Sequence, residues 1–249
     1  MSDETKQPRD DGASWAKPVD HLQVSGVPAG GINLNVQGKQ LTGLLKGFGQ
    51  MWQKTYRVAL TGQEVEPTRL ISEWKANFPS FWPAGNNFYG KLGSISPGDV
   101  AVLNLSGPAR SSISTGIMVI YADDESFSFM TPQGHIFAGM ITFSGFSEEG
   151  TTVAQIQALI RASDPVFEMM ARLGVVHKQE DTFWHGTLAN LARHFDVTDP
   201  QVTQKNILVD SRMQWAEAGN VWHNSAIRTA LHLPVRLVQK IFGKQRASV

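Results

Sequence analysis

The middle of the chain alternates apolar and polar residues with a period of two, which is typical of β-strands that bury one face. Short turns such as Ser96–Asp99 and Ser147–Gly150 separate these segments. Strands joined this tightly must be antiparallel neighbours, because a parallel pair needs a crossover of about a dozen residues. The pattern therefore predicts a six-stranded meander, with strands at 88–96, 99–106, 113–122, 126–131, 138–147 and 151–162.

A further strand at 48–61 and several helical segments flank the meander. Pro67 favours a helix start, because the N–H that proline lacks has no partner in the first helical turn. Phe78–Pro83 is an aromatic, proline-containing elbow that cannot continue as regular helix. Asp164 is a favourable N-cap for another helix. A long amphipathic helix at about 178–195 should lay its apolar stripe across the concave face of the sheet.

The two ends of the chain differ from this central part. Residues 1–20 carry few apolar side chains and predict a disordered leader, in which Trp15 is either a stray aromatic or an anchor onto the main domain. We expect the main domain at 21–200 and a basic, amphipathic helical extension at 201–249. In this extension an apolar stripe runs beside basic side chains, namely Arg228, Arg236, Lys240 and Lys244.

The composition narrows the possible functions. Apolar residues make up 41% of the 249 residues, enough to build a sizeable core and to exclude wholesale disorder. The 22 Lys and Arg balance 22 Asp and Glu, which argues against a globally basic nucleic-acid-binding protein. Because there is no Cys, disulfide frameworks, thiolate metal sites and a Cys nucleophile are excluded. No apolar run is long enough to cross a membrane, so we expect a cytoplasmic protein, with peripheral membrane contact as an open alternative.

The order of the predicted elements resembles the helix-grip fold of the SRPBCC superfamily, which covers START lipid-transfer domains, birch-allergen-like proteins and polyketide cyclases. Gly139–Phe143 and Thr152–Ile156 look like the last strands of such proteins, and Phe183–Leu191 looks like their closing helix. The resemblance covers about residues 48–196. It implies an α+β fold in which a seven-strand antiparallel curved sheet wraps a long C-terminal helix, here with an extra helical tail. It also implies an apolar cavity between sheet and helix that holds a lipid or another hydrophobic molecule.

Motifs for metals, cofactors and nucleophilic catalysis are missing from the sequence. The seven histidines include no HExxH pair and no other short ligand spacing, so we expect no metal site. Neither a P-loop nor a GxGxxG fingerprint is present, and no GxSxG elbow marks a nucleophilic serine. We therefore expect no bound cofactor.

His135 is the most suggestive titratable residue, because it lies between two strands expected to bound the mouth of the cavity. A neutral imidazole there orients a ligand or acts as a general base; the alternative is a turn histidine bonded to backbone. Arg161 either contacts a carboxylate or phosphate headgroup or forms a local ion pair with Asp164. Other expected ligand-binding residues are the polar Tyr89, Asn104 and Tyr121 and the aromatic Trp74, Phe81 and Trp82, the last three forming either core or a movable lid.

Three functions remain open from the sequence. The first is a carrier or sensor that binds a hydrophobic small molecule or lipid in an internal cavity. The second is a cofactor-independent cyclase- or isomerase-like enzyme with His135 as base and Tyr89 or Tyr121 as its partner. The third is an interaction protein whose cavity is filled by its own side chains. For the tail, the alternatives are packing on its own domain, contact with an anionic membrane and binding of a protein partner; nucleic acid is not expected, because no aromatic side chains interleave the basic ones.

Overall fold

The computed structural model describes residues 11–24, 31–91, 95–107 and 112–232. Arg236, Lys240 and Lys244 of the predicted tail, and residues 1–10 of the predicted leader, lie outside these described residues.

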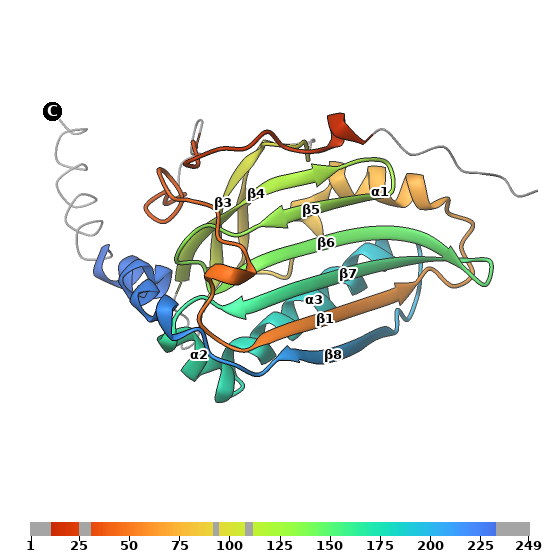
Figure 1. Ribbon diagram of the computed structural model, residues 1–249. Coiled ribbons are helices and arrows are strands. Elements are labelled where there is room, and N and C mark those ends of the chain that lie inside the picture. The colour runs from red at the N-terminus through yellow and green to blue at the C-terminus, as the bar shows by residue number, and fades with distance from the viewer. Residues whose placement is uncertain (1–10, 25–30, 92–94, 108–111, 233–249) are drawn as a thin grey trace, which may run out of the picture.

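One antiparallel sheet of eight strands organises the described part of the chain, in the order β2-β3-β4-β5-β6-β7-β1-β8 (Figure 1). The predicted α+β helix-grip architecture is confirmed, and the six-stranded meander is present, although the first of its strands, expected at 88–96, runs only over 87–89. The strands are β1 Met51–Ala59, β2 Asn87–Tyr89, β3 Val100–Ser106, β4 Ser112–Ala122, β5 Ser126–Met130, β6 Phe137–Glu148, β7 Thr151–Ala162 and β8 Val202–Asp210.

The eighth strand corrects the sequence analysis, which placed a helical extension from residue 201 and counted seven strands. β8 instead pairs antiparallel with β1, from Val58 opposite Val202 to Met51 opposite Asp210. The segment 207–209 is apolar and partly β-branched, which favours strand over helix. A sequence pattern does not show that β1 offers a free edge of N–H and C=O groups for such a segment to bind.

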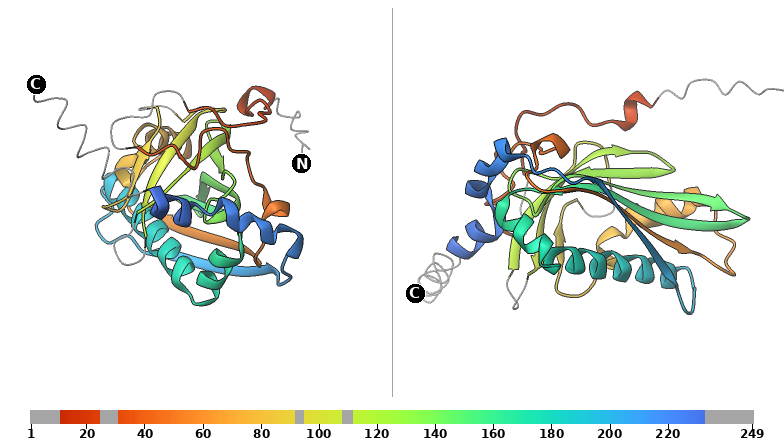
Figure 2. Two further views of the ribbon diagram at one scale, coloured as in Figure 1. Left: turned by 90° about the vertical axis from the view of Figure 1, so that its left-hand side faces the viewer. Right: turned by 60° about the horizontal axis from the view of Figure 1, so that its bottom comes forward.

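The α-helices are α1 Pro67–Ala76, α2 Pro165–Arg172 and α3 Val175–His194, and the described part of one more runs over residues 225–232. Pro67 opens α1 as expected. The carboxylate of Asp164 caps α2 by accepting hydrogen bonds from the N–H groups of Val166 at 2.8 Å and Phe167 at 3.0 Å. α3 lies across the concave face of the sheet, as its apolar stripe predicts (Figure 2). Short 3₁₀ segments connect these elements: η1 Gly12–Ser14, η2 Leu44–Lys46, η3 Phe78–Phe81 and η5 Trp215–His223.

The main core lies between the concave face, α1, the elbow and α3. Phe78 is fully buried there, with its ring edge-on to Phe129 and Phe143 at 5.2 Å between centroids. Trp74 packs against the same aromatic cluster. A second, smaller core covers the convex face, where Leu22 and other residues of the N-terminal segment contact β3 and β4.

The N-terminal segment is attached to the sheet from residue 11 onward. Trp15 forms an isolated β-bridge with Tyr121, and the two rings meet edge-to-face at 4.7 Å. The Trp15 side chain is still 51% exposed. Within residues 11–20 the anchor interpretation therefore describes the structure better than a disordered leader does.

Candidate functional site

A cavity of about 140 Å³ lies between the concave face of the sheet and α3. The strands β3 to β7 and the helix α3 contribute apolar side chains to its wall, because alternate residues of a strand point toward the helix. The apolar lining includes Leu103, Leu105, Ile117, Phe129, Phe137, Ile141, Ala158, Ile160, Val176, Phe183 and Trp184, with Trp82 of the elbow beside them. The cavity predicted from the family resemblance is therefore present and is predominantly apolar.

A chain of hydrogen bonds connects α3 to the elbow at one side of the cavity. The side-chain amide of Gln179 donates to the carbonyl oxygen of Ser106 at the end of β3. The Ser106 N–H donates to Asn86 Oδ1 at 3.0 Å, and Asn86 Nδ2 donates to the Pro83 carbonyl at 3.0 Å. Three of these residues line the cavity, so these bonds must break or shift if the cavity widens on this side.

His135 lines the cavity and is also bonded to backbone, so both interpretations of this residue describe the structure. Nδ1 of His135 lies 3.1 Å from both the backbone nitrogen and the carbonyl oxygen of Phe137, so the backbone of that residue holds the imidazole in either tautomer. Burial lowers the pKa of His135 to about 4, although its contact with the Phe137 backbone acts in the opposite direction. The imidazole is therefore uncharged at neutral pH.

Beside the cavity lies a buried ionic cluster that the sequence analysis missed. Lys54 points inward from β1 with only 2% of its side chain exposed, and its Nζ lies 2.9 Å from Glu180 Oε2 and 2.7 Å from Asp181 Oδ1. Tyr56, two residues along the same face, donates from its hydroxyl to Asp181 Oδ1 at 2.6 Å. Glu180 is also part of the cavity wall. The available signal was the position of Lys54, which shares the inward face of its strand with Tyr56 and Val58.

The hydrogen bonds of this cluster determine its charge state. Burial acts to raise the pKa of Asp181, but hydrogen bonds from Lys54 and Tyr56 outweigh it and hold that pKa below the ordinary value. Burial and the nearby carboxylates of Glu180 and Asp181 raise the pKa of Tyr56. Lys54 thus lies between the carboxyl groups of Glu180 and Asp181, and the hydroxyl of Tyr56 completes the cluster as a hydrogen-bond donor to Asp181.

The structure does not bring Tyr89, Asn104 and Tyr121 to the cavity. Tyr89 packs with the apolar cluster of the convex face. Asn104 lies between Leu103 and Leu105, which both line the cavity, so strand alternation directs it to the opposite face. In β4 the register shifts between Val119 and Tyr121. This irregularity places Tyr121 against Trp15, which no alternation pattern reveals.

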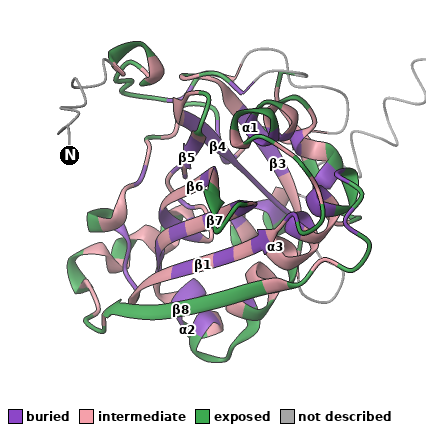
Figure 3. Ribbon diagram, turned by 90° about the vertical axis from the view of Figure 1, so that its right-hand side faces the viewer, coloured by how far each residue is buried: buried purple, intermediate pink, exposed green. Residues whose placement is uncertain are grey.

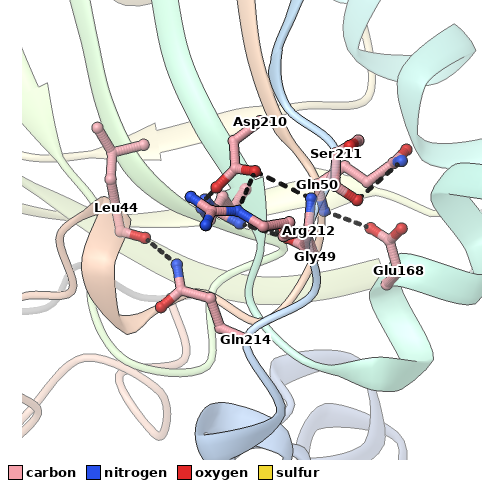
Figure 4. A network of polar contacts seen from close by, with 9 residues as sticks. Leu44, Gly49, Gln50, Glu168, Asp210, Ser211, Arg212 and Gln214 are labelled. Atoms are coloured by element: carbon pink, nitrogen blue, oxygen red, sulfur yellow. Dashed lines mark hydrogen bonds and ion pairs between the residues drawn. The ribbon is translucent and has the colours of Figure 1, made fainter.

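Arg161 bonds to groups other than its predicted partner Asp164, because the carboxylate of Asp164 caps α2 instead. The Arg161 guanidinium donates to the carbonyl oxygens of Gly49 at 2.7 Å and Arg212 at 2.9 Å, and Nη2 contacts Asp210 Oδ2 at 2.5 Å. Hydrogen bonds from the backbone and side chain of Arg212, and then from Arg161, hold the pKa of Asp210 well below its usual range. These contacts attach the end of β8 to the segment before β1 (Figure 4). Arg161 therefore does not face a cavity ligand.

Of the predicted aromatic residues, Trp82 lines the cavity, whereas Trp74 and Phe81 are buried in the core outside its wall. Arg228 is not part of the cavity wall; its Nε donates to Asn35 Oδ1 at 2.9 Å.

The described residues contain no group of three or more His, Asp and Glu side chains arranged to hold a metal ion. No helix within the described ranges has both the length and the hydropathy that a membrane crossing requires.

Known proteins resemble this chain in their structures, with little identity in sequence. No family model matches the chain, and no curated protein sequence matches it. The chain has the helix-grip fold. Similar solved structures include Ms6760 from Mycobacterium smegmatis, with 14% identity, a TM-score of 0.39, and coverage of 58% of this chain and 92% of that one.

Two other solved structures are also similar to the chain. The di-domain ARO/CYC StfQ from the steffimycin biosynthetic pathway is 11% identical, with a TM-score of 0.45, and 59% of this chain matches 50% of that one. The major latex-like protein 151 of Panax ginseng is 11% identical, with a TM-score of 0.40, and 59% of this chain matches 99% of that one. Likenesses this distant say nothing about what the chain binds.

Proposed function

We propose that the protein binds a hydrophobic small molecule or lipid segment in the cavity between the sheet and α3. The observation that carries this proposal is the apolar wall, which removes a nonpolar ligand from water. A volume of about 140 Å³ is close to that of an engineered apolar cavity of roughly 150 Å³ that binds benzene. A compact ring or a short acyl segment therefore fits the cavity without rearrangement.

The arrangement of polar groups favours binding over chemical conversion. A cyclase- or isomerase-like mechanism with His135 as base requires a hydroxyl partner within hydrogen-bond reach. Tyr89 and Tyr121 both lie on the other face of the sheet, and Glu180 is paired with Lys54. The cavity thus holds a ligand next to one neutral imidazole.

Native mass spectrometry of freshly purified protein, followed by organic extraction, tests this proposal. We expect a discrete apolar adduct that is lost on denaturation.

In parallel, Ala158→Leu places three added carbons in the cavity wall and should weaken the binding of an apolar fluorescent probe. Ala216→Leu, on the exposed 3₁₀ segment η5, is the matched control and should bind the probe like the original chain. Absence of an adduct together with equal probe binding by both variants would reject the cavity as the site.

A second proposal concerns the surface around η5. Trp222, Trp215 and Leu45 are exposed by 81%, 74% and 78%. We propose that this surface contacts an anionic bilayer, because Trp side chains favour the membrane interface and basic residues are attracted to anionic lipids. Lys46, whose Nζ lies 3.6 Å from Glu217, is next to Leu45, and Arg212, which is paired with Asp210, has 85% of its side chain exposed on the segment leading to η5.

Co-sedimentation with vesicles tests the bilayer contact. We expect the chain to pellet with vesicles containing phosphatidylglycerol but not with pure phosphatidylcholine. Changing Trp215 and Trp222 together to Ser should reduce this pelleting, while Trp15→Ser, which alters an exposed Trp near η1, should not. Equal pelleting of both variants would contradict the proposal.

A further inference from the structure

Three basic side chains from separate parts of the chain meet where the N-terminal segment contacts the C-terminal helices. Nζ of Lys39 lies 3.3 Å from Nδ1 of His223, the last residue of η5. Arg228, in the helix that follows, is close enough to lower the pKa of both of these groups. Figure 2, left, shows the C-terminal helices of this end of the molecule facing the viewer. We call these three residues the basic cluster.

No acidic side chain balances the basic cluster within the described residues. None of its three members forms an ion pair with Asp or Glu there, and Arg228 donates instead to the neutral oxygens of Asn35 and Leu34. Within the described residues, the like charges of the basic cluster are therefore uncompensated.

The electrostatics of the cluster reflect this imbalance. Burial and the charge of Arg228 lower the pKa of Lys39. Burial, followed by the charges of Lys39 and Arg228, lowers the pKa of His223. With the Lys39 ammonium donating to Nδ1, the neutral imidazole carries its proton on Nε2, where it is a further donor.

Backbone and side-chain contacts hold the cluster in place, so it is not a chance meeting of mobile surface chains. The Ser225 N–H donates to the Gly134 carbonyl at 2.9 Å, and a Cβ on Gly134 would lie 1.9 Å from the His223 carbonyl oxygen. Asn35 Nδ2 donates to Thr229 Oγ1 at 3.2 Å, which joins the N-terminal segment to the helix of Arg228. These contacts therefore fix the backbone of the segments that carry the basic side chains.

We propose that Lys39, His223 and Arg228 form a binding site for a phosphate group. A compact ammonium, a forked guanidinium and an imidazole N–H together match the charge and the several acceptor oxygens of a phosphate. The phosphate belongs either to a lipid headgroup or to a small soluble molecule. The highly exposed Trp222 directly precedes His223, so a bilayer headgroup is sterically accessible. The site is separate from the cavity and does not depend on the cavity proposal.

Inorganic phosphate and sulfate are the first probes, used on the full chain. We expect either anion to shift the His223 imidazole resonances in NMR spectra and to raise the His223 pKa toward or above its ordinary value. Lys39→Gln should weaken binding of both anions by about tenfold, because a charge-assisted hydrogen bond is lost. Lys205→Gln removes the same charge from the exposed strand β8 and serves as the matched control, with unchanged binding expected.

Vesicles then distinguish the two sources of phosphate. If Lys39→Gln also reduces pelleting on phosphatidylglycerol vesicles, and inorganic phosphate competes with that pelleting, the ligand is a headgroup. If Lys39→Gln weakens phosphate binding and leaves pelleting unchanged, the ligand is soluble. If neither anion moves the His223 pKa and Lys39→Gln behaves like Lys205→Gln, the proposal is wrong. Changing Trp215 and Trp222 to Ser should alter pelleting with vesicles and leave the binding of inorganic phosphate unchanged. Failure of the bilayer proposal is therefore distinguishable from failure of the phosphate site.

Discussion

At the scale of single residues, His135 connects the cavity to the stability of the fold. Its pKa of about 4 in the folded chain lies below the value of about 6.5 expected in the unfolded chain. As the pH falls through 6.5, the unfolded state takes up the proton first, so stability is lost between pH 6.5 and 4. Below pH 4 both states are protonated and the loss stops.

We therefore expect His135 to contribute about 3 kcal/mol of pH-dependent stability, since each pKa unit corresponds to about 1.4 kcal/mol. Chemical denaturation at pH 7, 5.5 and 4 measures it as the difference between the original chain and His135→Gln. That difference should change across this range in favour of the variant. Using the difference cancels the opposite contribution of Asp164, whose pKa is raised by burial. Parallel pH profiles would show that His135 is not the group responsible.

Replacing Gly134 tests the contact between the turn at this residue and the backbone of His223. Its φ is +87°, and an added Cβ would clash with the His223 backbone. We expect Gly134→Ala to destabilise the chain by at least about 2 kcal/mol. Gly150 is the matched control, because its φ is +79° but nothing lies within 4 Å of an added Cβ. Gly150→Ala should cost only about 1 kcal/mol. Similar melting temperatures for the two variants would contradict the close approach of the His223 backbone to Gly134.

At the scale of elements, the buried pairing of β1 with α3 depends on Lys54. Changing Lys54 to Met leaves the carboxylates of Glu180 and Asp181 without their cation. We expect a loss of about 3–5 kcal/mol of unfolding free energy, measured by denaturant titration. Combining Lys54→Met with Glu180→Gln and Asp181→Asn removes the uncompensated charges and should recover a large part of that loss. A triple variant no more stable than the single one would contradict this electrostatic explanation.

The elbow after α1 offers a second comparison of elements. Trp82 lines the cavity, whereas Trp74 of α1 is fully buried outside the cavity wall. We expect Trp82→Phe to change the affinity for an apolar fluorescent probe more than it lowers the melting temperature. Trp74→Phe should lower the melting temperature and leave probe affinity unchanged. Equal loss of both quantities in the two variants would show that the elbow is only core.

At the scale of the whole molecule, the two edges of the sheet differ. β2 is a short edge of three residues, whereas β8 is nine residues long, pairs with eight residues of β1 and is exposed along most of its length (Figure 3). Residues 201–232 also supply Asp210 to the buried Arg161 and Asn224 to Asp164. Residues 201–232 therefore pack against the sheet and share hydrogen bonds with it.

Truncation tests this conclusion. A chain ending at residue 200 uncovers the edge of β1 and leaves the Arg161 guanidinium without Asp210, so we expect it to lose cooperative unfolding or to aggregate. A chain ending at residue 232 keeps every described contact and should retain a single unfolding transition. Circular dichroism during thermal unfolding distinguishes the two. A cooperative fold in the shorter chain would restore residue 200 as a domain limit.

Local patterns predict the meander, the start of α1, the cap of α2 and the position of α3, because strand alternation, helix caps and turn chemistry involve neighbouring residues. The same patterns misassign β8, whose partner β1 is more than 140 residues earlier in the chain. They also place Tyr121 in the cavity. That prediction is wrong because a register shift between Val119 and Tyr121 turns the Tyr121 side chain to the other face of the strand. His135 and Trp82 reach the cavity as expected, but Lys54 and Glu180 were missed, since burial of a charge depends on a partner from another element.

What the sequence determined by itself is the fold class: alternation and turns dictate an antiparallel sheet, and the apolar stripe of α3 must be buried against it. What only the tertiary structure decided is which polar residues meet. The burial of Lys54, the pairing of Arg161 with Asp210 and the basic cluster at Lys39 all join segments that are distant in the chain. The physical reason is range, since secondary structure follows from contacts a few residues apart, whereas a site depends on charges and hydrogen bonds that form only after the layers have packed.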